Sequence, residues 1–216
     1  MRVGADHEFH DEAFAKGWAE RFVPTPERMR LFDTIAAELR AVMPSGGVVV
    51  ELGIGPGYLA AHLLERLPGI RYIGLDFSEP MLALARERLA VFEGRVDYRQ
   101  ADLVTQDWWT MVPQAADGIV STWALHDLGD PEYTRSVYAA SRRVLKTGGV
   151  FLNGDFVKPD GSRHDYEPGR FEVATHLRML EEAGYRDAEC LMLLEHELEA
   201  PTAAQNYACL KAVAGE

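Results

Sequence analysis

The most constraining feature of this sequence is a glycine-rich turn between a buried strand and a helix. Residues Val48 to Tyr58 read VVVELGIGPGY, so Gly53, Gly55 and Gly57 occupy alternate positions just after a β-branched run. Glycines in such a turn let the backbone bend sharply and let a ligand approach it closely. The start of the following helix supplies unpaired N–H groups. The turn therefore predicts a strand–helix unit with a ligand site at its tip.

Strand and helix patterns alternate through the rest of the chain. We expect strands at 71–76, 96–100, 116–122 and 150–156, and helices at 27–42, 58–67, 78–92, 131–145 and 170–183. Two further strands, at 189–194 and 206–213, have no helical pattern between them. Such alternation favours a mostly parallel sheet with helices on both faces. The last two strands indicate an antiparallel hairpin at one side of that sheet.

Glycine loops after a strand serve several ligands, and the flanking residues discriminate between them. A phosphate-binding loop needs Gly-Lys-Ser/Thr at its end, whereas Gly57 is followed by Tyr58 and Leu59. The dinucleotide fingerprint G-x-G-x-x-G/A fits the spacing poorly. A nucleoside without a pyrophosphate needs an acid at the strand end and a tight loop. Glu51 and the three alternate glycines supply both.

Two more acids stand at the ends of the next two expected strands. Asp76 lies 19 residues after Gly57, where a carboxylate can accept hydrogen bonds from both ribose hydroxyls. Asp102 ends the following strand, where an adenine amino group could donate to it; the alternative is that Asp102 caps a helix. Acids at three successive strand ends are a stronger signal than the glycines alone.

These segments resemble the class I S-adenosylmethionine-dependent methyltransferases of the small-molecule type. The matching stretches are ELGIGPG (51–57), GLDFSEPM (74–81), QAD (100–102), DGIVS (117–121), ALH (124–126) and LKTGG (145–149). The resemblance implies a three-layer α/β sandwich of Rossmann-like fold. Its seven-stranded sheet would have the order 3-2-1-4-5-7-6, with strand 7 antiparallel. It also implies S-adenosyl-L-methionine as cofactor.

The same resemblance assigns roles to individual residues. Glu51 would lie near the methionine end of the cofactor, above the loop of Gly53, Gly55 and Gly57. Asp76 would bind the ribose. The remaining contacts would come from Phe77 and Met81 beside the adenine, Asp102 and Leu103 at its edge, and Ser121 through its backbone.

Residues outside the cofactor motifs are less specific. His126 follows the fourth strand, where an acceptor would approach, and is a candidate general base; a structural role for it stays open. The segment His164–Glu167 either contacts the acceptor or is a solvated loop. We expect no metal site at His7, His10 and Asp11, because terminal histidines on a polar segment are usually solvated. Trp108, Trp109, Cys190 and Cys209 are expected to pack in the interior.

Composition narrows the partners. A net charge of −12 without a basic run makes nucleic acid an unlikely ligand, because such binding needs phosphate-neutralising cations. No apolar run is long enough to span a bilayer, and the polar, acidic N-terminal residues lack a signal-peptide pattern. Two cysteines are too few for a disulfide scaffold. We therefore expect a cytoplasmic protein with no membrane partner; its oligomeric state stays open.

These inferences combine into one functional hypothesis. Residues 1–216 would form a single methyltransferase domain, with a helical cover segment at 1–45 and a catalytic core at 46–216. Residues 1–30 would act as a mobile cover, and 157–169 would shape the pocket for a small-molecule acceptor methylated on O, N or C. The alternatives are an NAD(P)-dependent oxidoreductase of the dinucleotide fold and a non-catalytic module that retains the fold to bind a partner.

Overall fold

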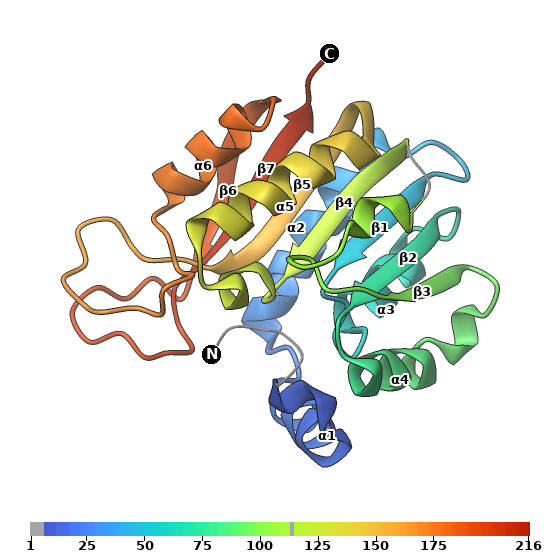
Figure 1. Cartoon of the computed structure of the whole chain (residues 1–216), viewed down its shortest axis with the longest axis horizontal. Helices are drawn as coiled ribbons and strands as arrows, with labels where there is room; N and C mark the ends of the chain where they lie inside the picture. Colours follow the sequence, from blue (N-terminus) through green and yellow to red (C-terminus); the bar gives the residue numbers. More distant parts are fainter. Residues whose placement is uncertain (1–6, 113–114) are drawn as a thin grey trace.

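The chain builds one seven-stranded sheet between two layers of helices (Figure 1). The structure, a computed structural model, describes residues 7–112 and 115–216. The strands are β1 (Val48–Leu52), β2 (Arg71–Asp76), β3 (Val96–Gln100), β4 (Ala116–Thr122), β5 (Leu145–Phe156), β6 (Tyr185–Leu194) and β7 (Tyr207–Ala214). Their order is β3-β2-β1-β4-β5-β7-β6. Strand β7 pairs antiparallel with both neighbours, while the other pairs are parallel. The expected sheet order is therefore confirmed.

Alternate strand residues feed two separate cores, as the side-chain period of two requires. Val49, Tyr72 and Val120 pack under α2 (Pro26–Val42), α3 (Tyr58–Arg66) and α4 (Glu79–Arg88). On the other face, Val50 and Ile119 pack under α5 (Pro131–Val144) and α6 (Val173–Glu182). Trp108 is fully buried in this second core, as expected for a packing residue.

Several element boundaries differ from the expected ones for local reasons. Strand β5 begins at residue 145 rather than 150, because Leu145 pairs with Ala116 before a bulge restores the register. Helix α6 begins at residue 173 rather than 170, because the backbone is still extended at Glu172, with φ −63° and ψ 147°. The expected helix 78–92 divides into α4 and a 3₁₀ turn, Ala90–Phe92. Ser78 caps α4 by accepting from the Met81 backbone N–H at 3.2 Å.

The N-terminal elements lie beside the glycine loop and α4 rather than in the sheet. A 3₁₀ turn, η1 (Glu8–His10), precedes α1 (Glu12–Arg21), and both contact α4. The Tyr58 hydroxyl donates to the Ala19 carbonyl at 2.8 Å, and the Ser78 hydroxyl donates to the Phe9 carbonyl. Figure 1 shows α1 below the sheet, next to α4. The first two helical elements therefore lie against Tyr58, which follows the glycine loop, and Ser78, which lies within the matched stretch 74–81.

Two long loops extend together from the opposite half of the sheet (Figure 1). One follows β5, over residues 157–172, and the other joins β6 to β7, over residues 195–206. Arg170 ties them together by donating to the backbone carbonyls of Gln205, at 3.3 Å, and Ala203. Among the described residues, none of the helices combines the length and the apolar character needed to cross a membrane.

Candidate active site

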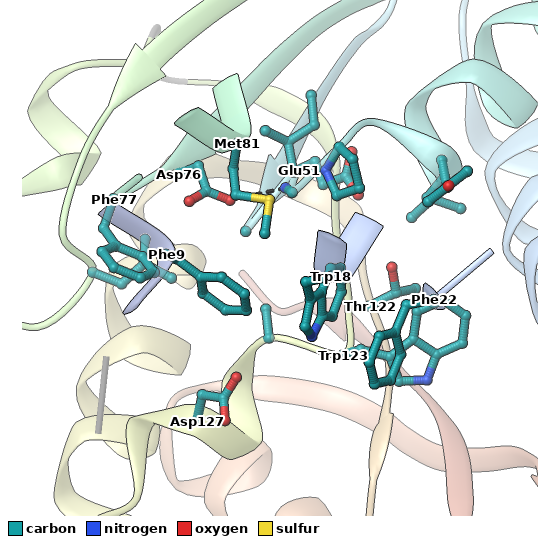
Figure 2. A pocket seen from close by; sticks show the side chains of 18 of the residues that line it. Phe9, Trp18, Phe22, Glu51, Asp76, Phe77, Met81, Thr122, Trp123 and Asp127 are labelled. Atoms are coloured by element: carbon teal, nitrogen blue, oxygen red, sulfur yellow. Dashed lines mark hydrogen bonds between the residues drawn. The ribbon is translucent and has the colours of Figure 1, made fainter. Parts of the chain in front are cut away.

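A cavity opens where the carboxyl ends of β1, β2 and β4 meet, the usual ligand position in sheets of this kind. It encloses about 920 Å³, part of which is open to solvent. Figure 2 shows Asp76 and Met81 on one side, with Phe9, Trp18, Phe22 and Trp123 crossing the space below them. Eight of the predicted cofactor residues line this cavity: Glu51, Gly53, Gly55, Asp76, Phe77, Met81, Asp102 and Leu103.

The three glycines of the loop have different structural roles. Gly53 allows close packing, because a Cβ there would lie 2.5 Å from the Ala124 Cβ. Gly57 begins α3 with a φ of +80°, a left-handed conformation that favours glycine. A Cβ on Gly55 would meet nothing within 4 Å, and the Gly55 N–H donates to Asp76 Oδ2 at 2.8 Å. The loop thus leaves space above Gly55 and is tied to the acid of the next strand.

Asp76 is a buried acid held by backbone donors. Its Oδ2 accepts from Gly55 N–H, and its Oδ1 accepts from Ser78 N–H at 2.9 Å. Burial raises the pKa of Asp76 to about 6, against the opposing effect of these hydrogen bonds. Each carboxylate oxygen has a second lone pair, so Asp76 can still accept from two hydroxyl groups in the cavity.

Glu51 is the second buried acid of this cavity. The Tyr72 hydroxyl donates to its Oε2 at 2.7 Å. Burial raises the pKa of Glu51 well above its ordinary value, and the nearby Asp76 charge adds to the effect. The groups that act on this carboxyl are a phenol and another acid, so a bound cation would relieve an unfavourable charge.

Phe77 lies beside Phe9 on the left of the cavity in Figure 2. The Phe77 ring packs against the rings of His7, Phe9 and His10, with centroids 5.3–6.3 Å apart. Both histidines contact the Phe77 ring. His10 is exposed, as the sequence suggested, whereas His7 is half-buried. Asp102 has a structural task as well: its carboxylate accepts from Val104 N–H at 2.8 Å and so holds a turn rather than a helix.

The aromatic side chains of the N-terminal segment close the cavity from outside. Phe9, Trp18 and Phe22 line it, and Trp18 and Phe22 stack at 4.4 Å between centroids. Phe9 packs edge-on against Trp18 at 5.3 Å. These rings replace water over the opening of the cavity, which strengthens electrostatic interactions inside it.

A second chamber adjoins the first and shares its aromatic wall. The residues lining both are Phe9, Trp18, Phe22, Trp123 and Asp127. The second chamber alone is lined by His7, Glu8, Phe14, Arg28, His126, Phe156, Glu167, Arg170, Ala203 and Ala204. Glu167 thus brings the 157–169 loop to this chamber; that the loop shapes the pocket for an acceptor stays a prediction. The loop between β6 and β7 also contributes, which the sequence did not indicate.

His126 is held between two carboxylates at the edge of this chamber. Its Nδ1 lies 2.7 Å from Asp155 Oδ1, and its backbone N–H donates to Asp155 Oδ2 at 3.0 Å. Its Nε2 lies 3.4 Å from Asp127 Oδ1. The Asp155 charge raises the pKa of His126 despite its burial, and the paired imidazole lowers the pKa of Asp155. His126 lines the second chamber and not the cofactor cavity.

The remaining two predicted cofactor residues, Gly57 and Ser121, do not line the cavity. Gly57 caps α3, and Ser121 is fully buried with its hydroxyl donating to the Leu52 carbonyl at 2.8 Å. The next residues, Thr122 and Trp123, line the cavity in place of Ser121. Trp123 has a positive φ of 51°, so the chain turns sharply after β4. The contact expected of Ser121 is through its backbone, so it stays a prediction.

The residues of the first cavity fit S-adenosylmethionine. Two buried acids, Glu51 and Asp76, line the cavity, and no atom lies within 4 Å of the position that a Cβ on Gly55 would take. A positively charged nucleoside matches both acids: hydroxyls donate to Asp76, and cationic charge offsets the buried Glu51. The aromatic rings of Phe9 and Phe77 offer flat surfaces for a base.

Comparisons with known proteins agree with this geometry. Residues 49–149 match the family described as a methyltransferase domain. An uncharacterized methyltransferase of Bacillus cytotoxicus is 36% identical over 124 residues, covering 57% of this chain and 54% of that protein. A trans-aconitate 2-methyltransferase of Variovorax paradoxus is 32% identical over 171 residues, covering 77% and 61%. The chain thus spans about half to three fifths of the length of these relatives.

A solved structure shows the same fold over nearly the whole chain. It is a phosphoethanolamine N-methyltransferase 2 of Haemonchus contortus in complex with phosphomonomethylethanolamine and S-adenosylhomocysteine. Its TM-score is 0.76 at 17% identity, covering 99% of this chain and 61% of that one. From the matched motifs, the sheet order and the cavity with its two buried acids, the chain belongs to the class I S-adenosylmethionine-dependent methyltransferase family, and S-adenosylmethionine is its cofactor.

Proposed function

We propose that this protein transfers a methyl group from its cofactor to an oxygen, nitrogen or carbon atom of a small-molecule acceptor. The observation that carries the proposal is the pair of adjoining chambers. One is lined by the cofactor motifs, and the other is lined by aromatic and charged side chains that no cofactor motif includes. The trans-aconitate 2-methyltransferases among the relatives support a small molecule as the acceptor, but not the charge of that acceptor.

The cofactor contacts follow from the positions of the motif residues. Asp76 accepts the two ribose hydroxyls, Glu51 faces the cationic end, and Phe77 and Met81 flank the adenine. Asp102 and Leu103 border the adenine edge. The loop Gly53–Gly57 supports the cofactor from below, and the backbone near Ser121 borders its methionine portion. The cofactor supplies an activated methyl group on a sulfonium, so the protein mainly has to align the acceptor and exclude water.

The domain organisation follows from the same arrangement. Residues 1–216 act as a single domain in which 46–216 hold the catalytic core and 1–45 form a helical cover. Two side-chain hydrogen bonds to backbone carbonyls, from Tyr58 to Ala19 and from Ser78 to Phe9, fasten the described part of this cover to the core. Opening of the cover, residues 1–30, would admit the acceptor, and its closure would keep water away from the reacting groups.

A turnover assay tests the proposal. The release of S-adenosylhomocysteine is followed with S-adenosylmethionine present and a panel of amines, alcohols, phenols, carboxylic acids and carbon acids as acceptors. We expect at least one class to raise the release rate above that of the protein and cofactor alone. Cofactor binding without turnover over the whole panel would instead support a non-catalytic module that has kept the fold.

A further inference from the structure

Asp127 stands at the junction of the two chambers. Five residues line both chambers, and among them Asp127 alone carries an ionisable side chain. Figure 2 shows it across the cavity from Asp76 and Met81, with its carboxylate directed toward the space between. An acceptor in the second chamber has to meet the methyl group of a cofactor in the first. The junction is therefore the place where a group acting on the acceptor atom is needed.

The groups behind Asp127 fix its position. His126 points Nε2 at Asp127 Oδ1, 3.4 Å away, while its Nδ1 is held at 2.7 Å by Asp155. Both ring nitrogens of His126 therefore face carboxylates. The side chain of His126 is 10% exposed, against 31% for Asp127. An acceptor in the chamber can reach the Asp127 carboxylate more readily than the imidazole behind it.

The charges around the second chamber disfavour an acidic acceptor. Arg170 Nε lies 3.1 Å from Glu167 Oε2, and Arg28 Nε lies 3.8 Å from Glu195 Oε1. Both arginines also donate to backbone carbonyls of the 203–205 segment. The acids on or directly behind the wall are Glu8, Asp127, Asp155, Glu167 and Glu195, and the cations are Arg28, Arg170 and His126. Burial lowers the pKa of His7, so His7 adds little positive charge near neutral pH.

We propose that Asp127 is the acceptor-facing catalytic residue and that the acceptor is an amine or alcohol, neutral or cationic, with an aromatic or apolar body. His126 and Asp155 are positioning residues that hold Asp127 in place. This inference rests on the proposed methyl transfer and adds the acceptor class to it. The aromatic walls supplied by Trp18, Phe22, Trp123 and Phe156 match the body of such an acceptor, and an ammonium group gains from both the carboxylate and the rings.

The reaction then has a defined proton path. A neutral amine or alcohol would donate its N–H or O–H to Asp127, which would orient the lone pair of that atom toward the methyl carbon. A protonated amine has no lone pair, so it would first give one proton to the Asp127 carboxylate. As the new bond to carbon formed, the methyl–sulfur bond would break with its electron pair left on sulfur, and the proton lost by the acceptor would pass through Asp127 to solvent. Burial raises the pKa of Asp127, and Asp155 and Glu167 act in the same direction, whereas His126 and His7 oppose them. A raised pKa makes the carboxylate a better base.

A matched pair of probes tests the acceptor class by calorimetry. Phenethylamine and 3-phenylpropionate share their aromatic body and differ in charge. Each is titrated into the protein saturated with S-adenosylhomocysteine. We expect the amine to bind at least roughly tenfold more tightly than the carboxylate. In Asp127→Asn, which keeps the size of the side chain, the preference should become clearly smaller, although Glu8 and Glu167 still line the chamber. Glu132→Gln removes an exposed acid of α5 outside both chambers and should keep it.

A second measurement compares the pH dependence of the two proteins. The affinity for phenethylamine should fall as the pH is lowered, and it should fall less in Asp127→Asn, because Asp127 with its raised pKa takes up a proton only in the wild type while His7 and His126 titrate in both. Tighter binding of the carboxylate, an unchanged preference in Asp127→Asn, or binding of neither probe at millimolar concentration would overturn the assignment. Failure of S-adenosylhomocysteine itself to bind would contradict the proposed function instead, so the two failures are distinguishable.

Discussion

The pH dependence of cofactor affinity gives a quantitative test of Asp76. Burial raises the pKa of Asp76 to about 6 in the cofactor-free protein. The ribose hydroxyls of a bound cofactor would donate to the ionised carboxylate and stabilise it, so cofactor binding should lower this pKa. Affinity for S-adenosylhomocysteine should then be constant above about pH 7 and fall as Asp76 takes up a proton. If the bound-state pKa is about 4, the affinity at pH 5 is roughly tenfold weaker, which is about 1.4 kcal/mol.

The variant Asp76→Asn isolates this contribution. Loss of a charged acceptor for two hydroxyls should weaken binding by about 2–3 kcal/mol at pH 8. The weakened binding should lose most of its dependence on pH, because the amide does not titrate. Isothermal titration calorimetry between about pH 5 and pH 8 measures both effects, and far-UV circular dichroism checks the fold. Flat wild-type affinity over this range would refute the assignment. Full pH dependence in the variant would refute it too and would point to Glu51 as the titrating acid.

Three further predictions concern other parts of the site. Glu51→Gln should raise the melting temperature of the cofactor-free protein at pH 8 by at least about 2 °C. The reason is that a carboxyl group whose pKa is raised by folding destabilises the folded state at a pH well above its unfolded pKa. A lower melting temperature in differential scanning fluorimetry would contradict this. His126→Ala should lower turnover more than it lowers cofactor affinity, and equal turnover of variant and wild type across about pH 6–9 would remove His126 from the mechanism. Deletion of residues 1–22 should leave a folded domain with weaker cofactor retention, and S-adenosylhomocysteine should protect Phe14–Phe22 from hydrogen exchange; identical protection with and without the ligand would show that this segment is not a cover.

Motif positions were predictable because strand ends of a parallel sheet meet at one edge. Gly53, Asp76 and Asp102 follow three neighbouring strands, so their convergence needed only the sheet order. The direction of individual side chains was not predictable in the same way. Ser121 and Thr122 are adjacent at the end of β4, yet Ser121 is buried against Leu52 while Thr122 lines the cavity.

Contacts between distant segments were the harder part. Asp155 lies 29 residues after His126, and nothing in their spacing indicates that the carboxylate holds both the backbone and the ring of His126. The same is true of the loop 195–206, whose approach to the second chamber depends on hydrogen bonds from Arg28 and Arg170 to its carbonyls. Such contacts depend on the tertiary arrangement of irregular loops, for which no hydrophobic period exists.

Binding of S-adenosylhomocysteine to the wild-type protein tests the central claim most directly. The two buried acids and the open glycine loop predict a dissociation constant in the micromolar range, which corresponds to about 8 kcal/mol. Calorimetry at pH 8 should show this binding, and NADH titrated under the same conditions should show none. Absence of heat and of thermal stabilisation with millimolar S-adenosylhomocysteine, or tighter binding of NADH, would contradict the account.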